Sequence, residues 1–240
     1  MSENTREMVS ENSVISRKKA LVIFDMDGTL FQTQSVTIPA VQDTLSGFGL
    51  PVPEADAIAS YIGRPVPEYH AWLASLCPPG LVAAVIAAAD RREIDLVREV
   101  GDVFPGVHSM LDRLRGEGYA LAMSSNAPED YFDAVLDTQV LRAYFHPALC
   151  RGARFAGKVE IVGEILAQHA TRLFAVVGDR KDDIESARAH GGRAIAVTYG
   201  FGSVADLENA DAHVDCAAAI PDALTRVLNL PRTRSGNSPA

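Results

Sequence analysis

The stretch Ala20-Leu21-Val22-Ile23-Phe24-Asp25-Met26-Asp27-Gly28-Thr29 decides the fold, because five apolar residues run directly into a pair of carboxylates. An uninterrupted apolar run of this kind is typical of a central strand in a parallel sheet that is covered on both faces. Ligands of such sheets bind beyond the carboxyl ends of the strands, where Asp25 and Asp27 would stand. Side chains two apart on a strand share a face and lie about 6.6 Å apart. One small hard cation could therefore serve both carboxylates.

Taken alone, Asp-x-Asp-Gly is equally typical of a solvated turn, in which Gly28 adopts a conformation that residues with a Cβ avoid. A calcium loop of the helix-loop-helix type does not fit, because its first ligand would be Ile23 and its last would be Gln34. The rest of the chain has to decide between a turn and a site.

Apolar runs that resemble strands recur along the chain, with helix-patterned segments between them. They lie at 20–24, 119–123, 173–177 and 194–197. This alternation predicts the α/β class, with a Rossmann-like doubly wound parallel sheet.

A long stretch, roughly 33–104, has no convincing strand and interrupts this alternation. Its helix-like patterns are 40–48, 54–61, 67–76 and 81–100. We therefore expect an inserted α-helical cap domain, whose edges are punctuated by Thr37-Ile38-Pro39 and Val103-Phe104-Pro105-Gly106. Such edges could act as hinges. The expected division is mobile tails at 1–18 and 231–240, a catalytic core at 19–33 and 105–230, and a cap at 34–104.

Composition narrows the class of protein. A chain of 240 residues with 48% hydrophobic content can bury a full core. Acids outnumber Lys and Arg by 31 to 22, which argues against a nucleic-acid surface. Three distant cysteines (Cys77, Cys150 and Cys216) suggest neither disulfides nor a zinc site. The polar start lacks a secretion signal, and the longest apolar run, 81–89, is too short for a membrane span. We expect a cytoplasmic protein without membrane contact, as a monomer or homodimer.

Three further polar clusters accompany the acidic pair. Ser124-Ser125-Asn126 follows a strand-like run, and it suits either a helix cap or an anion site at a helix N-terminus. Lys158 is one of only four lysines, and it opens a helix, where a cation is disfavoured unless an anion lies nearby. Gly178-Asp179-Arg180-Lys181-Asp182-Asp183 joins a strand to a helix. Its acids complement the helix dipole, or they complete an oxygen-only magnesium site with Asp25 and Asp27.

Together, and in this order, the clusters resemble the motifs of the haloacid dehalogenase superfamily, and specifically its phosphoglycolate-phosphatase-like branch, over roughly 20–228. The matching elements are Asp25-Met26-Asp27-Gly28-Thr29, Ser125-Asn126, Lys158, and Gly178-Asp179 with Asp183. Residues 189–192 and 197–202 look like the family's closing strand and loop. The helical insertion falls where this branch carries its cap.

The resemblance implies a magnesium-dependent phosphatase of small phosphorylated metabolites. Asp25 would be the nucleophile that forms an aspartyl-phosphate, and Asp27 would be the general acid and base, with a raised pKa. Ser125, Asn126 and Lys158 would bind the phosphate. The metal ligands would be Asp25, the Asp27 backbone carbonyl, Asp179 and Asp183; whether Asp182 shares this role stays open.

Substrate specificity is expected in the cap, near Ile62-Gly63-Arg64-Pro65, which is similar to the family's substrate-facing loop. Arg64 is the first candidate, with Tyr69, His70 and Trp72 behind it. Aromatic residues and histidines at helical spacing are equally typical of core packing. Phe31-Gln32-Thr33 stands where the family often has an Asp-Ser pair, so phosphoglycolate itself is in doubt as the substrate. Val159, where the family commonly has Pro, and Arg180-Lys181, where it often has a small residue, are smaller departures from the family pattern.

Several alternatives share parts of this pattern. The resemblance implies that a phosphomutase on the same scaffold, or a phosphonoacetaldehyde hydrolase, would use a lysine in the cap. Both are disfavoured because the insertion has no lysine. A true dehalogenase is disfavoured by the presence of Asp27, and a signalling receiver by the order of its acids and the length of the chain. A non-catalytic phosphate-binding protein stays open, although every matched catalytic position is filled.

Overall fold

The computed structural model describes residues 20–169 and 171–229, so both predicted tails lie outside the described residues. Within the described residues, six parallel strands form one sheet in the order β3-β2-β1-β4-β5-β6. The strands are β1 (Leu21–Phe24), β2 (Ala120–Ser125), β3 (Ala148–Cys150), β4 (Phe174–Gly178), β5 (Arg193–Val197) and β6 (Ala212–Val214). The predicted parallel α/β sheet is confirmed.

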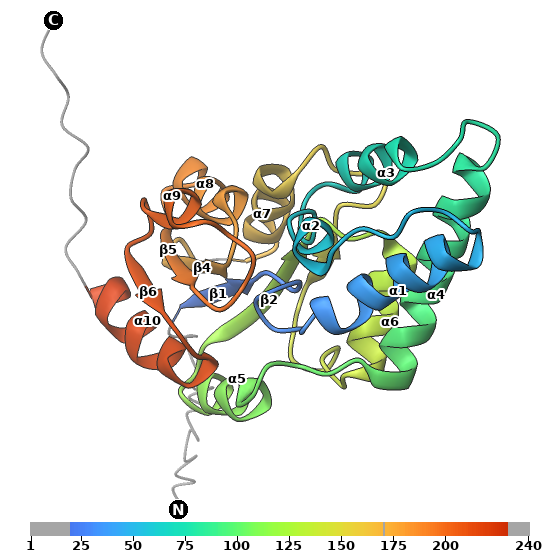
Figure 1. The fold of residues 1–240 in the computed structure, drawn as a ribbon. Helices are drawn as coiled ribbons and strands as arrows, with labels where there is room; N and C mark the ends of the chain where they lie inside the picture. The colour runs from blue at the N-terminus through green and yellow to red at the C-terminus, as the bar shows by residue number, and fades with distance from the viewer. Residues whose placement is uncertain (1–19, 170, 230–240) are drawn as a thin grey trace, which may run out of the picture.

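Helices cover both faces of this sheet (Figure 1). Alternate residues of β1 enter different apolar clusters, since Val22 and Phe24 join one and Leu21 and Ile23 join the other. The first cluster includes residues of α5 (Val107–Gly116), α6 (Glu129–Thr138) and α10 (Ile220–Asn229). The second includes residues of α7 (Lys158–Ala167), α8 (Lys181–Ala189) and α9 (Val204–Leu207). The sheet is therefore doubly wound, as predicted from the apolar run at 20–24.

The helical insertion between β1 and β2 is also present. It contains α1 (Gln34–Gly47), α2 (Ala55–Ala59), α3 (Val66–Ser75) and α4 (Val82–Val100), after which α5 returns the chain to the sheet. These four helices, here called the cap helices, pack around an apolar cluster of their own. One face of α1 and the end of α4 also join the main core, through residues such as Val36 and Val97. The insertion thus has a core but also rests on the sheet domain.

The expected edge of the insertion at Thr37-Ile38-Pro39 is wrong, because α1 runs through Pro39. A proline lacks the N–H that would bond to the carbonyl of Ser35, so the helix forgoes one bond near its start. Burial of Val36, Ala40 and Val41 offsets that loss. The helix α1 therefore begins directly after Thr33 and is not interrupted at the proline.

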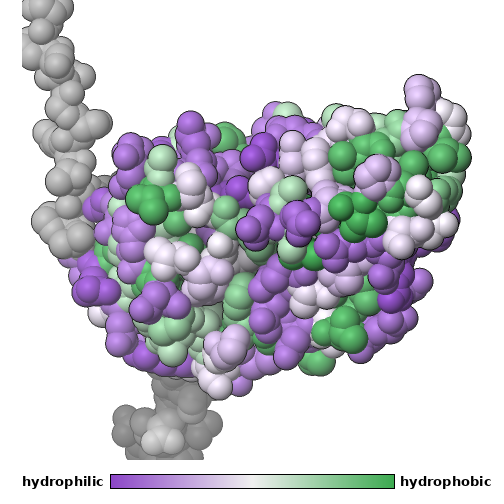
Figure 2. All heavy atoms as spheres, viewed as in Figure 1, coloured by the Kyte–Doolittle hydropathy of each residue, from purple (hydrophilic) through white to green (hydrophobic). Residues whose placement is uncertain are grey.

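In the part of the chain that the structure describes, no helix is long and apolar enough to cross a membrane. On the face drawn in Figure 2, hydrophilic and hydrophobic residues are mixed over the sheet domain, and several hydrophobic groups lie over the cap helices. The exposed large hydrophobic residues include Phe48 and Val52, which follow α1. They are single exposed side chains of the kind common on globular proteins.

Candidate active site

The carboxyl ends of the central strands place the predicted site residues at one edge of the sheet. Phe24 at the end of β1 lies level with Met123 of β2 and Val177 of β4. The residues that follow, Asp25 and Asp179 among them, therefore emerge at neighbouring positions. This is the edge at which ligands of doubly wound sheets bind.

A tight turn after β1 requires glycine at position 28. Gly28 has a φ of +77°, and a Cβ there would lie 2.5 Å from Oδ2 of Asp179 and 2.7 Å from the ring of Phe201. Both the left-handed conformation and the lack of space exclude a side chain. The turn therefore brings the Asp25-to-Thr29 segment against the end of β4.

Three carboxylates converge here. One oxygen each from Asp25, Asp179 and Asp183 lies within 4.8 Å of the others, and all three residues are buried. Burial, and next the charge of Asp25, raises the pKa of Asp179 to about 7. Burial also raises the pKa of Asp183 well above its usual value. A buried set of oxygen donors with excess negative charge fits a divalent cation such as magnesium.

Lys158 provides a positive charge inside this cluster. Its Nζ donates to Oδ1 of Asp25 at 2.6 Å and to Oδ1 of Asp183 at 2.5 Å. Burial lowers its pKa, but Asp183 and Asp25 raise it, with a net result well above the usual lysine value. These two carboxylates are the nearby anions that its position at the start of α7 led us to expect.

The Asp27 side chain is not part of this set of three carboxylates. Its Oδ1 accepts hydrogen bonds from Thr33 Oγ1 at 2.7 Å and from the Tyr131 hydroxyl at 2.9 Å. Burial, followed by the charge of Asp25, raises its pKa to about 6. The expected direction of this shift is confirmed, although burial contributes more than the neighbouring carboxylate.

Ser125 and Asn126 follow β2 and are both buried. Neither caps α6, because Pro128 occupies the N-cap position and α6 begins at Glu129. The Ser125 hydroxyl instead accepts from the Ala127 N–H at 3.0 Å. The Asn126 side-chain amide donates to Asp182 at 2.7 Å and to the carbonyl of Gly63, in the cap, at 3.4 Å. Asp182 thus pairs with Asn126 rather than joining the three carboxylates.

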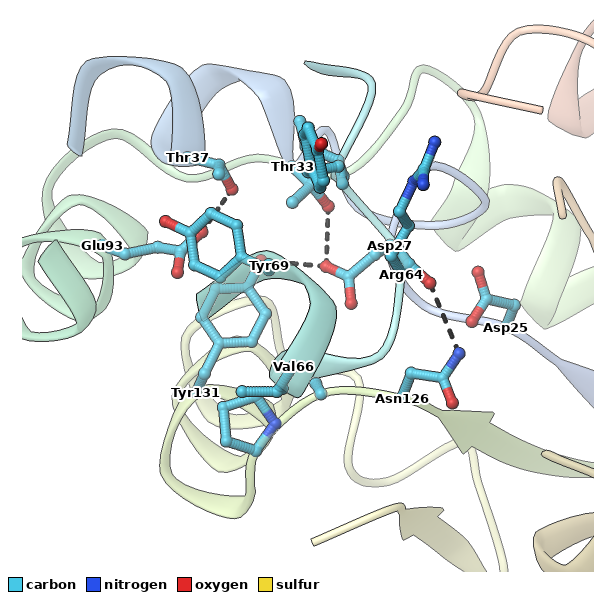
Figure 3. Close-up of a pocket in the computed structure, with 15 residues that line it drawn as sticks. Asp25, Asp27, Thr33, Thr37, Arg64, Val66, Tyr69, Glu93, Asn126 and Tyr131 are labelled. Atoms are coloured by element: carbon cyan, nitrogen blue, oxygen red, sulfur yellow. Dashed lines mark hydrogen bonds between the residues drawn. The ribbon is translucent and has the colours of Figure 1, made fainter. Parts of the chain in front are cut away.

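A cavity of about 70 Å³ opens between this edge and the cap helices (Figure 3). Asp25, Asp27, Asn126 and Tyr131 line it from the sheet domain, and Thr37, Arg64, Tyr69 and Glu93 line it from the cap side. In the view of Figure 3, Asp27 lies between Asp25 and the pair of Thr37 and Glu93. A small molecule could therefore contact both domains at once.

The cap candidates differ in their positions. Arg64 and Tyr69 line the cavity, as the sequence led us to expect. His70 is not among its lining residues, and its Nε2 lies 3.1 Å from Asp90. Trp72 packs within the cap helices and stacks on Tyr61, with ring centroids 4.5 Å apart. A substrate contact by His70 thus stays a prediction without support from its position.

Residues 22–197 match the family model described as haloacid dehalogenase-like hydrolase. The chain belongs to this family of haloacid dehalogenase-like hydrolases. A phosphoglycolate phosphatase of Cupriavidus necator is 31% identical over 235 residues, covering 89% of this chain and 96% of the relative. A probable phosphatase IndB of Dickeya dadantii is 32% identical over 207 residues, covering 82% and 88%.

Solved structures agree with the fold of this haloacid dehalogenase-like hydrolase. A putative phosphoglycolate phosphatase from Lactobacillus delbrueckii superposes with a TM-score of 0.74 over 87% of this chain and 99% of that chain. Its sequence identity is 23%, so the likeness concerns the fold alone.

Sequence reasoning missed several residues that line the cavity in this hydrolase, among them Thr33, Thr37, Glu93 and Tyr131. Thr33 and Thr37 lie four positions apart, so they share one face of the chain entering α1, and Thr37 lies between Val36 and Ile38, which was a usable signal. Glu93 gave none, because it lies in the charged run Arg91-Arg92-Glu93, which is typical of a solvated helix face.

Proposed function

We propose that the protein is a magnesium-dependent phosphatase that hydrolyses a small phosphorylated metabolite through an aspartyl-phosphate on Asp25. The observation that carries this proposal is the convergence of Asp25, Asp179, Asp183 and Lys158 at the edge of the cavity. Three segments that are separate in sequence supply a nucleophile, oxygen ligands and a cation in one buried place. The name of the Cupriavidus necator relative supports a small phosphorylated substrate.

In the first step, a carboxylate oxygen of Asp25 attacks phosphorus, and the bond from phosphorus to the leaving oxygen breaks. Asp27 gives its proton to that leaving oxygen, which a pKa of about 6 makes feasible near neutral pH. In the second step, Asp27 takes a proton from water, whose oxygen attacks phosphorus. The bond between Asp25 and phosphorus breaks, and inorganic phosphate leaves.

Lys158 and Ser125 are proposed to hold the phosphoryl oxygens, with Asn126 beside them. Asp25, Asp179, Asp183 and the backbone carbonyl of Asp27 would hold the metal. Bound magnesium would supply positive charge that offsets the repulsion between Asp25 and an anionic phosphate. The buried position of these groups strengthens such electrostatic stabilisation, because the site excludes most water.

Residues 34–104 are proposed to act as the cap, and 19–33 with 105–230 as the catalytic core. The support is that the cavity is lined from both parts. A closed cap would exclude water from the aspartyl-phosphate while the leaving group departs. A cytoplasmic location and a monomeric or dimeric state stay expectations.

The proposal is tested by phosphate release from a panel of small phosphate esters, with and without magnesium, for the wild type and Asp25→Asn. We expect magnesium-dependent release that falls at least about 10³-fold in the variant, because the nucleophile is lost. Equal release by both proteins would reject Asp25 as the nucleophile. Binding of phosphate without turnover by the wild type would indicate a phosphate-binding protein, and transfer to a sugar hydroxyl would indicate a phosphomutase.

A further inference from the structure

The cap side of the cavity carries an acid that the proposed reaction does not use. Glu93, on α4, lines the cavity and is partly buried. Its Oε1 accepts a hydrogen bond from the Thr37 hydroxyl (Figure 3). Burial raises the pKa of Glu93 to about 8, and the charges of Asp27 and Asp90 act in the same direction. When ionised, this group only accepts hydrogen bonds, so in this position it suits a hydrogen-bond donor on the substrate.

The position of Asp27 fixes which part of a substrate would reach Glu93. Under the proposed function, the phosphoryl group lies at Asp25, and the leaving oxygen lies within reach of Asp27. Because Asp27 lies between Asp25 and Glu93 in the view of Figure 3, the rest of the leaving group extends toward Glu93, Thr37 and Tyr69. These three side chains offer a carboxyl group and hydroxyls.

The only cation among the described residues that line this cavity is Arg64. Its Nε donates to the Ser60 carbonyl at 2.8 Å, and its guanidinium lies over the Tyr61 ring, 4.9 Å from the centroid. The side chain is 43% exposed, at the mouth of the cavity. A carboxylate on the leaving group would therefore face Glu93 inside the cavity without a buried cation to pair with.

We infer that Glu93 is a specificity-determining residue that selects phosphate esters whose leaving group carries hydrogen-bond donors, a hydroxyl or an ammonium group, and rejects those that carry a carboxylate. This inference rests on the proposed function and deepens it. The small cavity favours a leaving group of only a few non-hydrogen atoms. Glu93 accepts the donor, and Thr37 holds the carboxyl group in place.

The test compares kcat/KM for glycerol phosphate, ethanolamine phosphate and phosphoglycolate, which carry a hydroxyl, an ammonium and a carboxylate group. The wild type should prefer one or both donor substrates over phosphoglycolate by at least about tenfold. The assay is run at about pH 9, where Glu93 is ionised because its pKa is about 8. In Glu93→Gln this preference should fall by about tenfold or more, because the charge that repels a carboxylate is lost. A larger loss for ethanolamine phosphate than for glycerol phosphate would identify the ammonium group as the preferred donor.

The matched control is Glu99→Gln, on the same helix, where Glu99 pairs with Arg92 on the surface. It should leave the preference unchanged. If Glu93→Gln fails to fold, Thr37→Val should also reduce the preference for the donor substrates, because the Glu93 carboxyl group loses the hydrogen bond that holds it in place. The role of Glu93 is overturned if the wild type prefers phosphoglycolate, or if Glu93→Gln and Thr37→Val leave the preference unaltered. In either case, turnover that depends on Asp25 would still support the proposed phosphatase. Loss of the dependence on Asp25 rejects the phosphatase itself.

Discussion

At the scale of single residues, Lys158 shows how one charge holds the site together. Its ammonium group is almost completely buried, with 2% of the side chain exposed, and it bridges two carboxylates from different segments. A buried ion pair adds little net stability compared with apolar packing, but removal of one partner leaves the others uncompensated. The structural role of Lys158 is therefore to neutralise part of the negative charge of Asp25 and Asp183, which the proposed nucleophile and metal site require.

Replacement of this lysine should destabilise the metal-free protein. We expect Lys158→Met to lower the free energy of unfolding by about 3 kcal/mol in urea denaturation with a chelator present, because Asp25 and Asp183 lose their cation. Magnesium should restore part of that loss. The control is Lys181→Met, whose ammonium group forms an exposed pair with Glu185 and should matter by less than about 0.5 kcal/mol. Equal effects of the two substitutions would contradict this account.

Glu93 should give the stability of the protein a dependence on pH. Its pKa is about 8 in the folded chain and near 4.5 without burial, so the folded state binds its proton more tightly. Stability must then fall as pH rises between these values, because ionisation costs more in the folded state. The groups facing Glu93 are Thr37, Asp27, Asp90 and His70.

Glu93→Gln removes this titration. The stability of the variant relative to the wild type should therefore grow by about 3 kcal/mol between about pH 5.5 and 8.5, in urea denaturation with a chelator. Glu99→Gln is the control and should show a constant difference. A constant difference for Glu93→Gln as well would show that this carboxyl group ionises in the folded chain as it does in the unfolded chain.

The sequence revealed those site residues whose chemistry leaves a local pattern. Asp25 and Asp27 follow an apolar run, and Lys158 opens a helix, where a cation needs an explanation. Glu93 and Tyr131 lie within helices among other polar residues, so no local pattern separates them from a solvated surface. Their role depends on which helix faces which strand end, and that is a property of tertiary packing.

At the scale of elements, the loop between α2 and α3 is tied to the sheet domain by side chains from two strand ends. The Arg180 guanidinium, at the N-cap of α8, donates to the carbonyls of Ile62 and Ser60. Asn126, after β2, donates to the carbonyl of Gly63. These contacts hold the loop that carries Arg64 against the mouth of the cavity.

Loss of the Arg180 contact should loosen this loop selectively. We expect Arg180→Met to speed hydrogen exchange of the Ile62 and Arg64 amides by about tenfold or more, since a charged hydrogen bond contributes about 1.5–3 kcal/mol. Exchange in β1 should not change. Arg188→Met, on the same helix, is the control, because Arg188 pairs with Asp211 away from the loop. Faster exchange throughout the protein, or unchanged exchange in the loop, would refute the prediction that Arg180 holds this loop locally.

The elements themselves were predictable where their apolar pattern was strong. The four strand-like runs correspond to β1, β2, β4 and β5, the central part of the sheet, which is buried on both faces. The edge strands β3 and β6 escaped prediction, because each has only three residues and is partly exposed. Pro39 led us to expect an edge where α1 is continuous, because the burial of neighbouring side chains outweighs the loss of one helical hydrogen bond.

At the scale of the whole molecule, folding gathers negative charge at one edge of the sheet. Asp25 is more than a hundred residues away from Asp179 and Asp183 in the sequence, yet one oxygen of each lies within 4.8 Å of the others. Motif order along the chain predicted that they converge, because parallel strands share one carboxyl edge. The cap residues that line the cavity could not be predicted in this way, because the cap helices do not end at one common edge as parallel strands do.

Magnesium should therefore stabilise the folded protein, because a cation bound at this edge neutralises carboxylates that are separated and solvated in the unfolded chain. At a metal concentration about 100 times the dissociation constant, the gain is about 2.7 kcal/mol. For a chain of this size, that corresponds to a rise in Tm of several degrees. The measurement is thermal unfolding with a chelator and then with increasing magnesium.

Two aspartates near the site separate a specific ion effect from a general one. Asp179→Asn should abolish the rise in Tm, because it removes an oxygen ligand from the converging set. Asp182→Asn should keep the rise, because that carboxylate accepts from Asn126 and lies outside the set. Loss of the rise in both variants would extend the metal site to Asp182. A rise that survives in Asp179→Asn would mean that magnesium acts elsewhere on this acidic chain, and the shared-ion geometry would have to be abandoned.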